Sequence, residues 1–318
     1  MRVRFHLPDF ARHFRFNMLL VTLMEQCPEY FREGVEIASF YGAFPPSLWN
    51  GGRFQGGMCD KRTVKAVTEA FNAKGIPLRF TFTNPVLEKK HLSDEFCNMV
   101  MSTANNGLNE VIVVSPILED YIRKNYPKYK LTSSTCKRIT DPEKLSEELE
   151  KNYHIVVIDY DLNNRFEVLE KIPNKEKCEI LVNACCEPDC KLRSDHYKYI
   201  GYDQIAYANH VRKYPNVPFN TEKLLTAHPE SKAVRECRCM KRTVFDIKNM
   251  RCHVTPDDIW EKYVPMGFSQ FKIEGRSFDT LNLMEHYLYY LVKPEFKERA
   301  RFTLLASMEK NGIITINE

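Results

Sequence analysis

Short apolar runs rich in β-branched residues alternate with helical patterns along the chain, and this alternation limits the fold more than any other feature. Six runs follow the rhythm, at 34–42, 77–84, 109–116, 130–135, 153–161 and 178–184. Two more candidates, 250–254 and 268–276, come after a longer irregular stretch. Eight such units predict an α/β fold, a closed (β/α)8 TIM-type barrel spanning 1–318 as a single domain. A doubly wound open sheet is the alternative.

Helical segments fill the intervals between these runs. The segment 60–75 starts at a capping residue, Asp60, and stops at Gly75. Others are expected at 93–107, 118–126, 142–152, 166–172, 257–264 and 281–292. The region 191–246 breaks the rhythm and is rich in Tyr, His, Lys and Cys. We expect it to be an insertion after strand six that covers the barrel mouth, and no separate domain.

Net charge and hydropathy limit the partners and the cellular location expected for the protein. The net charge of +4, from 46 basic and 42 acidic residues, neither indicates a nucleic-acid partner nor opposes a polyanionic one. No secretory signal is evident, and the apolar run 17–24 is too short to span a bilayer. We therefore expect a cytoplasmic protein with no membrane span. Thiols stay reduced in that compartment, so the eleven cysteines do not indicate a disulfide framework.

Polar residues follow most of the predicted strands, at the end of a barrel where chemistry takes place. They are Asn50, Asn84, Ser115, Ser134, Asp159, Asp161, Asn183, Cys252, Lys272, Glu274 and Arg276. The last three alternate with apolar residues in FKIEGR, so they share one face of the final strand. If that face points into the barrel, the charges must pair or meet a charged ligand. If the strand end has reached solvent, they need no partner.

The cysteines fall into two groups. Five are scattered singly and are expected to be small core residues: Cys27, Cys59, Cys97, Cys136 and Cys178. Six lie near the predicted ends of strands six and seven or close the insertion: Cys185, Cys186, Cys190, Cys237, Cys239 and Cys252. Converging thiolates suit a [4Fe–4S] cluster or tetrahedral zinc. A structural zinc site usually shows two C-x-x-C pairs, which are absent here, so iron–sulfur is favoured.

Several of these segments resemble the U32 peptidase, or collagenase-like, family. The resemblance rests on GFSQFKIEGRS, on RCHVTPDDIWEKYVPMG, on V-N-x-x-C-x-x-x-C after strand six, and on IDYDLNNRFEVLEKI. It covers 34–277 and implies a TIM-type barrel with a [4Fe–4S] cluster at its mouth. It also implies Cys186 and Cys190 as the first two ligands, Cys237 or Cys239 as the third and Cys252 as the fourth. The first two cysteines stand closer together than in the family, and Cys185 competes with Cys186.

The family resemblance implies an oxygen-independent hydroxylation, or a related modification, of an aromatic or cyclic substrate such as an RNA base or a quinone precursor. Candidate acid–base residues are Glu274, Asp159 and Asp161, and candidate substrate-binding residues are Asn84, Lys272, Arg276, Asn183 and Arg53. Two alternatives stay open. One is a peptidase, the family's older label. The other is a non-catalytic iron–sulfur or zinc protein that acts as a scaffold, a redox sensor or the partner of another subunit.

Overall fold

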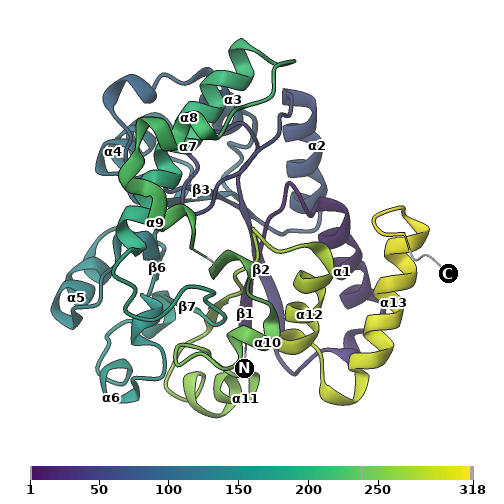
Figure 1. Cartoon of the computed structure of the whole chain (residues 1–318). Coiled ribbons are helices and arrows are strands. Elements are labelled where there is room, and N and C mark those ends of the chain that lie inside the picture. The colour runs from purple at the N-terminus through teal and green to yellow at the C-terminus, as the bar shows by residue number, and fades with distance from the viewer. Residues whose placement is uncertain (1, 238, 316–318) are drawn as a thin grey trace.

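The computed structural model describes residues 2–237 and 239–315, and within them eight parallel strands close into one barrel in chain order (Figure 1). The strands are β1 Val3–Pro8, β2 Val35–Gly42, β3 Leu78–Phe82, β4 Glu110–Val113, β5 Lys130–Ser133, β6 Ile155–Val157, β7 Cys178–Leu181 and β8 Gln270–Lys272. The predicted α/β TIM-type barrel is therefore confirmed.

Two of the predicted strand assignments need correction. The first strand, β1, was not predicted, and the segment 250–254 is not a strand but a turn with one ladder-like bond, from Val254 N to Val182 O at 2.9 Å. In β1 the charged Arg4 and the closing Pro8 obscure the apolar pattern, whereas MRCHV is too short for its periodicity to be decisive. The insertion therefore follows the seventh strand, β7, rather than the sixth.

The helices of the barrel wall are α1 Phe14–Gln26, α2 Lys61–Asn72, α3 Glu95–Thr103, α4 Pro116–Asn125, α5 Pro142–Glu150, α6 Phe166–Leu169, α11 Pro256–Asp258, α12 Thr280–Leu291 and α13 Lys297–Lys310. Aspartates begin several of them: Asp60, Asp94, Asp141 and Asp279 each accept a hydrogen bond from a first-turn backbone N–H. α11 continues as a π-helix, Ile259–Tyr263. Within the described residues, none of the helices is both long and apolar enough to cross a bilayer.

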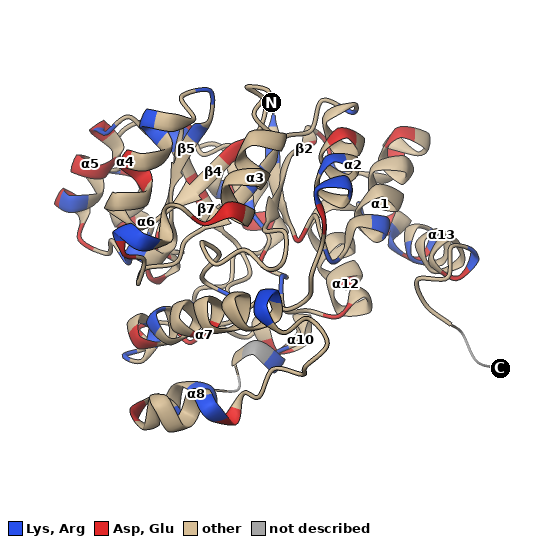
Figure 2. Cartoon of the chain, turned by 90° about the horizontal axis from the view of Figure 1, so that it is seen from above, with Lys and Arg blue, Asp and Glu red and all other residues tan. Residues whose placement is uncertain are grey.

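The insertion supplies α7 Arg193–Lys213, α8 Glu222–Ala227, α9 Lys232–Arg235 and α10 Val244–Ile247. It lies across one end of the barrel, where the carboxyl ends of the strands meet (Figures 1 and 2). Asn84, which follows β3, donates to the carbonyl oxygen of Gly201 in α7 at 3.1 Å. A side chain at Gly201 would place its Cβ 2.4 Å from the Asn84 side chain, so only glycine lets α7 approach this closely.

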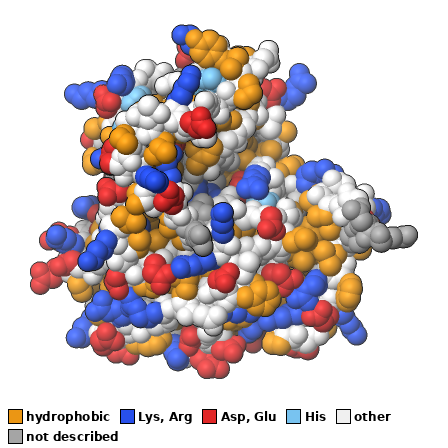
Figure 3. Space-filling view, in the orientation of Figure 1, with side chains coloured by type: hydrophobic (Ala, Val, Ile, Leu, Met, Phe, Trp, Pro, Cys, Tyr) orange, Lys and Arg blue, Asp and Glu red, His pale blue; other side chains and the backbone are white. Residues whose placement is uncertain are grey.

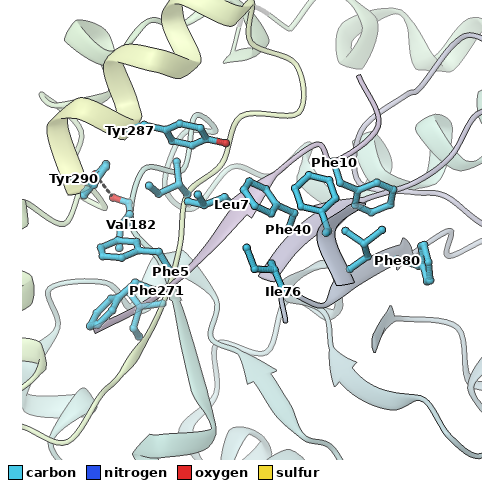
Figure 4. Packing of buried hydrophobic residues seen from close by; sticks show 14 of the residues in the cluster. Phe5, Leu7, Phe10, Phe40, Ile76, Phe80, Val182, Phe271, Tyr287 and Tyr290 are labelled. Atoms are coloured by element: carbon cyan, nitrogen blue, oxygen red, sulfur yellow. Dashed lines mark hydrogen bonds between the residues drawn. The ribbon is translucent and has the colours of Figure 1, made fainter. Parts of the chain in front are cut away.

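The hydrophobic core lies mainly between the strands and the helices outside them. Figure 4 shows Phe5, Phe40, Phe80 and Phe271, from β1, β2, β3 and β8, packed with residues of the surrounding elements. Tyr290 of α12 closes this layer with a hydrogen bond from its hydroxyl to the Val182 carbonyl oxygen at 3.1 Å. These apolar contacts hold the helical wall on the barrel.

Inside the barrel the core is ionic. Glu179 of β7 pairs with Arg79 of β3, with Lys272 of β8 at 3.1 Å and with His6 of β1 at 3.4 Å. Burial would raise the pKa of Glu179, but the charges of Arg79 and Lys272 hold that pKa well below its usual value. Burial lowers the pKa of His6 to about 3, so His6 is neutral at pH 7. Four strands are thus joined through one carboxylate.

Replacing Glu179 tests how much its carboxylate contributes to the stability of the fold. We expect Glu179→Gln to lower the free energy of unfolding by about 3–5 kcal/mol, because it leaves buried cations unpaired. The folded pKa of Glu179 is depressed, so its stabilisation is present above the unfolded pKa of about 4.3 and is lost as the pH falls below it. Urea titrations between pH 7 and pH 3 would measure both effects. Glu36→Gln, at an exposed pair with Arg2, is the control and should change stability by less than about 1 kcal/mol.

Candidate functional site

The charged face of the last strand points into the barrel mouth, where all three charges find partners. Lys272 pairs with Glu179, and Glu274 pairs with Arg53 of the loop after β2. Arg276 donates to Asn50 and Thr81 side chains at 2.9 Å and to the Gly51 carbonyl oxygen at 2.8 Å. The glycine is required, because a Cβ at Gly51 would lie 2.2 Å from the Thr83 carbonyl oxygen. The three charges therefore organise the mouth and do not extend into solvent.

A small cavity of about 70 Å³ lies between these groups. Its walls include Arg53, Lys272, Glu274 and Arg276, together with three residues that were not predicted: Tyr41, Cys136 and Tyr197. Burial lowers the pKa of Lys272 to about 8, which brings this amine within reach of proton exchange near neutral pH. A cavity of roughly 150 Å³ is needed to hold one benzene ring. This cavity therefore fits a small polar group or a few waters.

The two predicted asparagines do not line this cavity. Asn183 is fully buried after β7 and exchanges two hydrogen bonds with the backbone of Glu274, at 2.6 and 3.0 Å. Asn84 is also fully buried and holds the Leu48 carbonyl oxygen at 2.8 Å besides that of Gly201. Asn183 thus fixes the last strand end, and Asn84 fixes the insertion.

Asp159 and Asp161 meet at a single cation, Arg193, at the start of α7. Arg193 Nη2 lies 2.8 Å from Asp159 Oδ2 and 2.9 Å from Asp161 Oδ2. The guanidinium also stacks 4.3 Å above the Tyr160 ring and is 1% exposed. Burial raises the pKa of Asp159, and the charge of Arg193 opposes that rise. This arrangement ties the first turn of the insertion to the end of β6.

The six cysteines singled out in the sequence converge over the mouth. Cys186 and Cys252 pack together with Tyr160 and with the half-buried Cys190. Cys239 interacts with the thiols of Cys185, Cys186 and Cys237. Interaction with Cys239 lowers the pKa of Cys186 to about 6, whereas burial raises the pKa of Cys252 to about 12. The first three thiols in sequence come from the loop after β7, and Cys237 and Cys239 come from the insertion.

Cys185 differs from its neighbour in what it contacts. Its thiol accepts from Arg53 Nη2 at 3.2 Å and packs against the main core, while it also interacts with the Cys239 thiol. Its backbone N–H donates to Glu274 Oε2 at 2.9 Å. Arg53, Glu274 and Cys185 thus connect the thiols to the small cavity.

His196 of α7 lies beside the thiols, although it was not predicted as a site residue. Its ring nitrogen and the sulfur atoms of Cys237 and Cys239 all lie within 4.8 Å of one another. Burial lowers the pKa of His196 to about 4, so the ring is neutral at pH 7 and able to bind a metal ion. His196 lies on a helix far from ECRC in sequence, so its proximity to Cys237 and Cys239 could not be predicted from the sequence.

A second, larger cavity of about 510 Å³ adjoins the first at Arg276. Phe44, Pro45, Phe54 and Met58 contribute apolar walls, and Asp9 contributes a carboxylate. Asp9 follows β1, is 2% exposed and has a left-handed backbone with φ of 57°. One carboxylate oxygen accepts from Arg12 N at 2.9 Å, and the other has no hydrogen-bond donor among the described residues. Sequence reasoning missed Asp9 because it missed β1.

Removing Arg193 should release the insertion without unfolding the barrel. We expect Arg193→Met to leave two buried carboxylates unpaired and to speed proteolytic cleavage within 191–246 by about tenfold or more. Limited proteolysis with mass spectrometry would locate the cuts. Lys191→Met, at an exposed neighbouring position, is the matched control. Equal cleavage rates in the two variants would show that the Arg193 pairs do not anchor the insertion.

Comparison with known proteins finds a distant structural likeness and no sequence match. No protein-family model matches the sequence, and no curated protein matches it. A solved structure of a U32 peptidase, Mk0906, is 14% identical with a TM-score of 0.49, over 86% of this chain and 94% of that chain. A likeness this distant does not extend to activity or to individual residues.

Proposed function

We propose that this protein holds a [4Fe–4S] cluster at the barrel mouth and modifies an aromatic or cyclic substrate, such as an RNA base or a quinone precursor. The resemblance of its sequence motifs to the U32 family implies this chemistry. The observation that carries the proposal is the convergence of six thiols directly beside a buried, charged cavity. Soft thiolates are the ligands that iron–sulfur clusters require.

The proposed ligands are Cys186, Cys190 and Cys252, with Cys239 or Cys237 as the fourth. Cys186 is favoured over Cys185 because it packs with Cys190 and Cys252, whereas Cys185 is engaged by Arg53. When bound, the cluster would supply one-electron chemistry. Both the loop after β7 and the insertion would contribute thiolates.

The chain's own residues suit a substrate divided between the two cavities. The larger cavity has room and apolar walls for a ring, and the smaller one accepts only a polar group. Arg276 lines both, and Lys272 and Arg53 add positive charge for a carboxylate-bearing co-substrate. Lys272, with its pKa near 8, and Glu274 are the proposed proton carriers. Because Asp159 and Asp161 are paired with Arg193, we assign them a positioning role.

A zinc site is the second candidate, and His196 is the observation that favours it. An imidazole and two thiols within 4.8 Å of one another match three ligands of a tetrahedral zinc centre. Such a centre would hold the insertion in place and would make the protein a scaffold or a partner subunit. The cluster would take Cys237 or Cys239 as its fourth ligand, and the zinc ion would need both, so the two centres are mutually exclusive.

A thiol peptidase is not supported by the contacts of the described residues. His253, the sequence neighbour of Cys252, has both ring nitrogens near tyrosine hydroxyls, those of Tyr289 and Tyr290, at 3.2 Å. The thiol interactions of Cys239 raise its pKa, so this cysteine, which lies near His196, is a weak nucleophile.

Anaerobic purification tests the cluster. We expect a brown protein with broad absorbance near 400 nm and about four irons and four sulfides per chain. Cys186→Ser should lose most of the iron, because it removes a central thiolate. Cys27→Ser, at a half-buried thiol outside the group, should keep it. A colourless protein with one zinc, lost in His196→Ala, would replace the cluster with the zinc site.

Activity is tested separately from assembly. We expect Lys272→Ala and Glu274→Ala to keep the iron content and to abolish the modified product in cells, read as profiles of modified RNA bases and quinones by mass spectrometry. Glu298→Gln, on the exposed face of α13, is the control. If either profile lacks a product in a strain without the protein, and both site variants restore it fully, the catalytic role fails.

A further inference from the structure

The end of the barrel opposite the thiols is also hollowed. A groove of about 980 Å³ lies where the strands begin, lined by residues at the starts of β1, β5, β6 and β8 and by the connections between them. Figure 2 shows Lys and Arg segments beside β5, at the end of the barrel away from α7. The groove shares no lining residue with the two cavities at the mouth. It is therefore a separate feature of the molecule.

Cations dominate the lining of this groove. Among the described lining residues, one acidic residue, Glu176, stands against four arginines and lysines, namely Arg4, Arg123, Lys130 and Lys177. Arg123 is paired with Glu119 at 2.8 Å. In the described part of the chain, neither Arg4 nor Lys130 has a carboxylate within 4.0 Å, and Lys177 reaches only the Leu149 carbonyl oxygen, at 3.4 Å. Among the described residues, these three positive charges thus have no carboxylate within 4.0 Å.

One buried carboxylate behind the groove, Glu110, interacts with Lys130 and Arg4, but it interacts with Arg79 as well. Glu179 is committed to Arg79 and Lys272, and Glu110 lies 3.4 Å from Arg79 and 3.5 Å from His154. Burial, together with the charges of nearby cations such as Lys130, lowers the pKa of His154 to about 4. His154 is therefore a neutral hydrogen-bonding group on the wall. The groove keeps a net positive charge that a ligand must balance.

We propose that this groove binds a small polyanion carrying two or more phosphate groups. Its volume lies at the upper end of the range for small-molecule sites, and its unpaired cations come from separate elements around a concave surface. A nucleic-acid surface would offer aromatic faces for stacking. Here Tyr129 and Tyr153 are 7% and 5% exposed, with hydroxyls bonded to Met101 and Glu119, so neither ring is free to stack.

Thermal unfolding of the full chain with sodium triphosphate at constant ionic strength tests the site. A ligand that neutralises repelling cations should raise the Tm, saturably, by on the order of 5 °C at a hundredfold excess over Kd. Arg4→Gln/Lys130→Gln should weaken triphosphate binding at least tenfold without lowering the Tm of the free protein. Lys89→Gln/Lys223→Gln, at two exposed lysines elsewhere, is the matched control and should bind like the parent. Lys177→Gln is a milder variant should the double variant fold poorly.

Further arms separate the possible ligands. If adenosine triphosphate binds with the same affinity as triphosphate, the site recognises the phosphate chain. If adenosine triphosphate binds more tightly, the site recognises a nucleotide. Either result supports the proposal. An equal shift with sulfate, an unchanged affinity in the double variant, or much tighter binding of a single-stranded oligonucleotide would each overturn it. Cys186→Ser should bind triphosphate normally, so failure of the metal centre does not affect this test.

Discussion

Hydrogen bonding of β1 to both β2 and β8 closes the barrel, and the arrangement at the mouth depends on that closure. Once β8 is held between β1 and β7, its alternation turns Lys272, Glu274 and Arg276 inward. Each then meets a partner from another part of the barrel: Glu179 on β7, Arg53 after β2, and Asn50 with Thr81. An open sheet with the same strands would keep Lys272 beside Glu179 on the neighbouring β7, but it would separate Glu274 and Arg276 from their partners after β2 and on β3. Closure and charge pairing therefore support each other.

The mouth is assembled from two chemically different halves that share one arginine. Arg53 contacts the Glu274 carboxylate and the Cys185 sulfur, so this side chain links the thiols to the charged cavity. The insertion completes the arrangement by bringing Cys237, Cys239 and His196 over this point. Charged and hydrophobic side chains are interspersed on the outer face of the insertion (Figure 3). The thiols and the charged cavity thus lie beneath the insertion, whose outer face has the mixed composition of a typical protein surface.

Sequence reasoning predicted the fold class and most elements because periodicity and capping are local signals. Helices begun by Asp60 and Asp141 appear as expected, and so do the apolar runs of β2 to β7. It did not identify β1, because Arg4 and Pro8 interrupt the apolar pattern of this short strand. Asp9 was missed for the same reason. Asp159 and Asp161 were recognised as polar strand-end residues, but their common partner Arg193 belongs to the insertion, and no periodicity relates the aspartates to it. Proximity of His196 to ECRC likewise needs the tertiary fold.

The two origins of the thiols affect how the molecule is assembled. Cys186 and Cys190 belong to the loop after β7, whereas Cys237 and Cys239 lie beyond α9, on the far side of the segment that Arg193 ties down. A metal ion or cluster held by both groups would act as a cross-link that encloses about 50 residues, and closing a loop of that length removes considerable entropy from the unfolded chain. The insertion would have to move away from the barrel mouth before the metal ion or cluster could bind. Maturation of the protein would then be an ordered process, in which the barrel closes first and the insertion settles only after its inorganic contents have arrived.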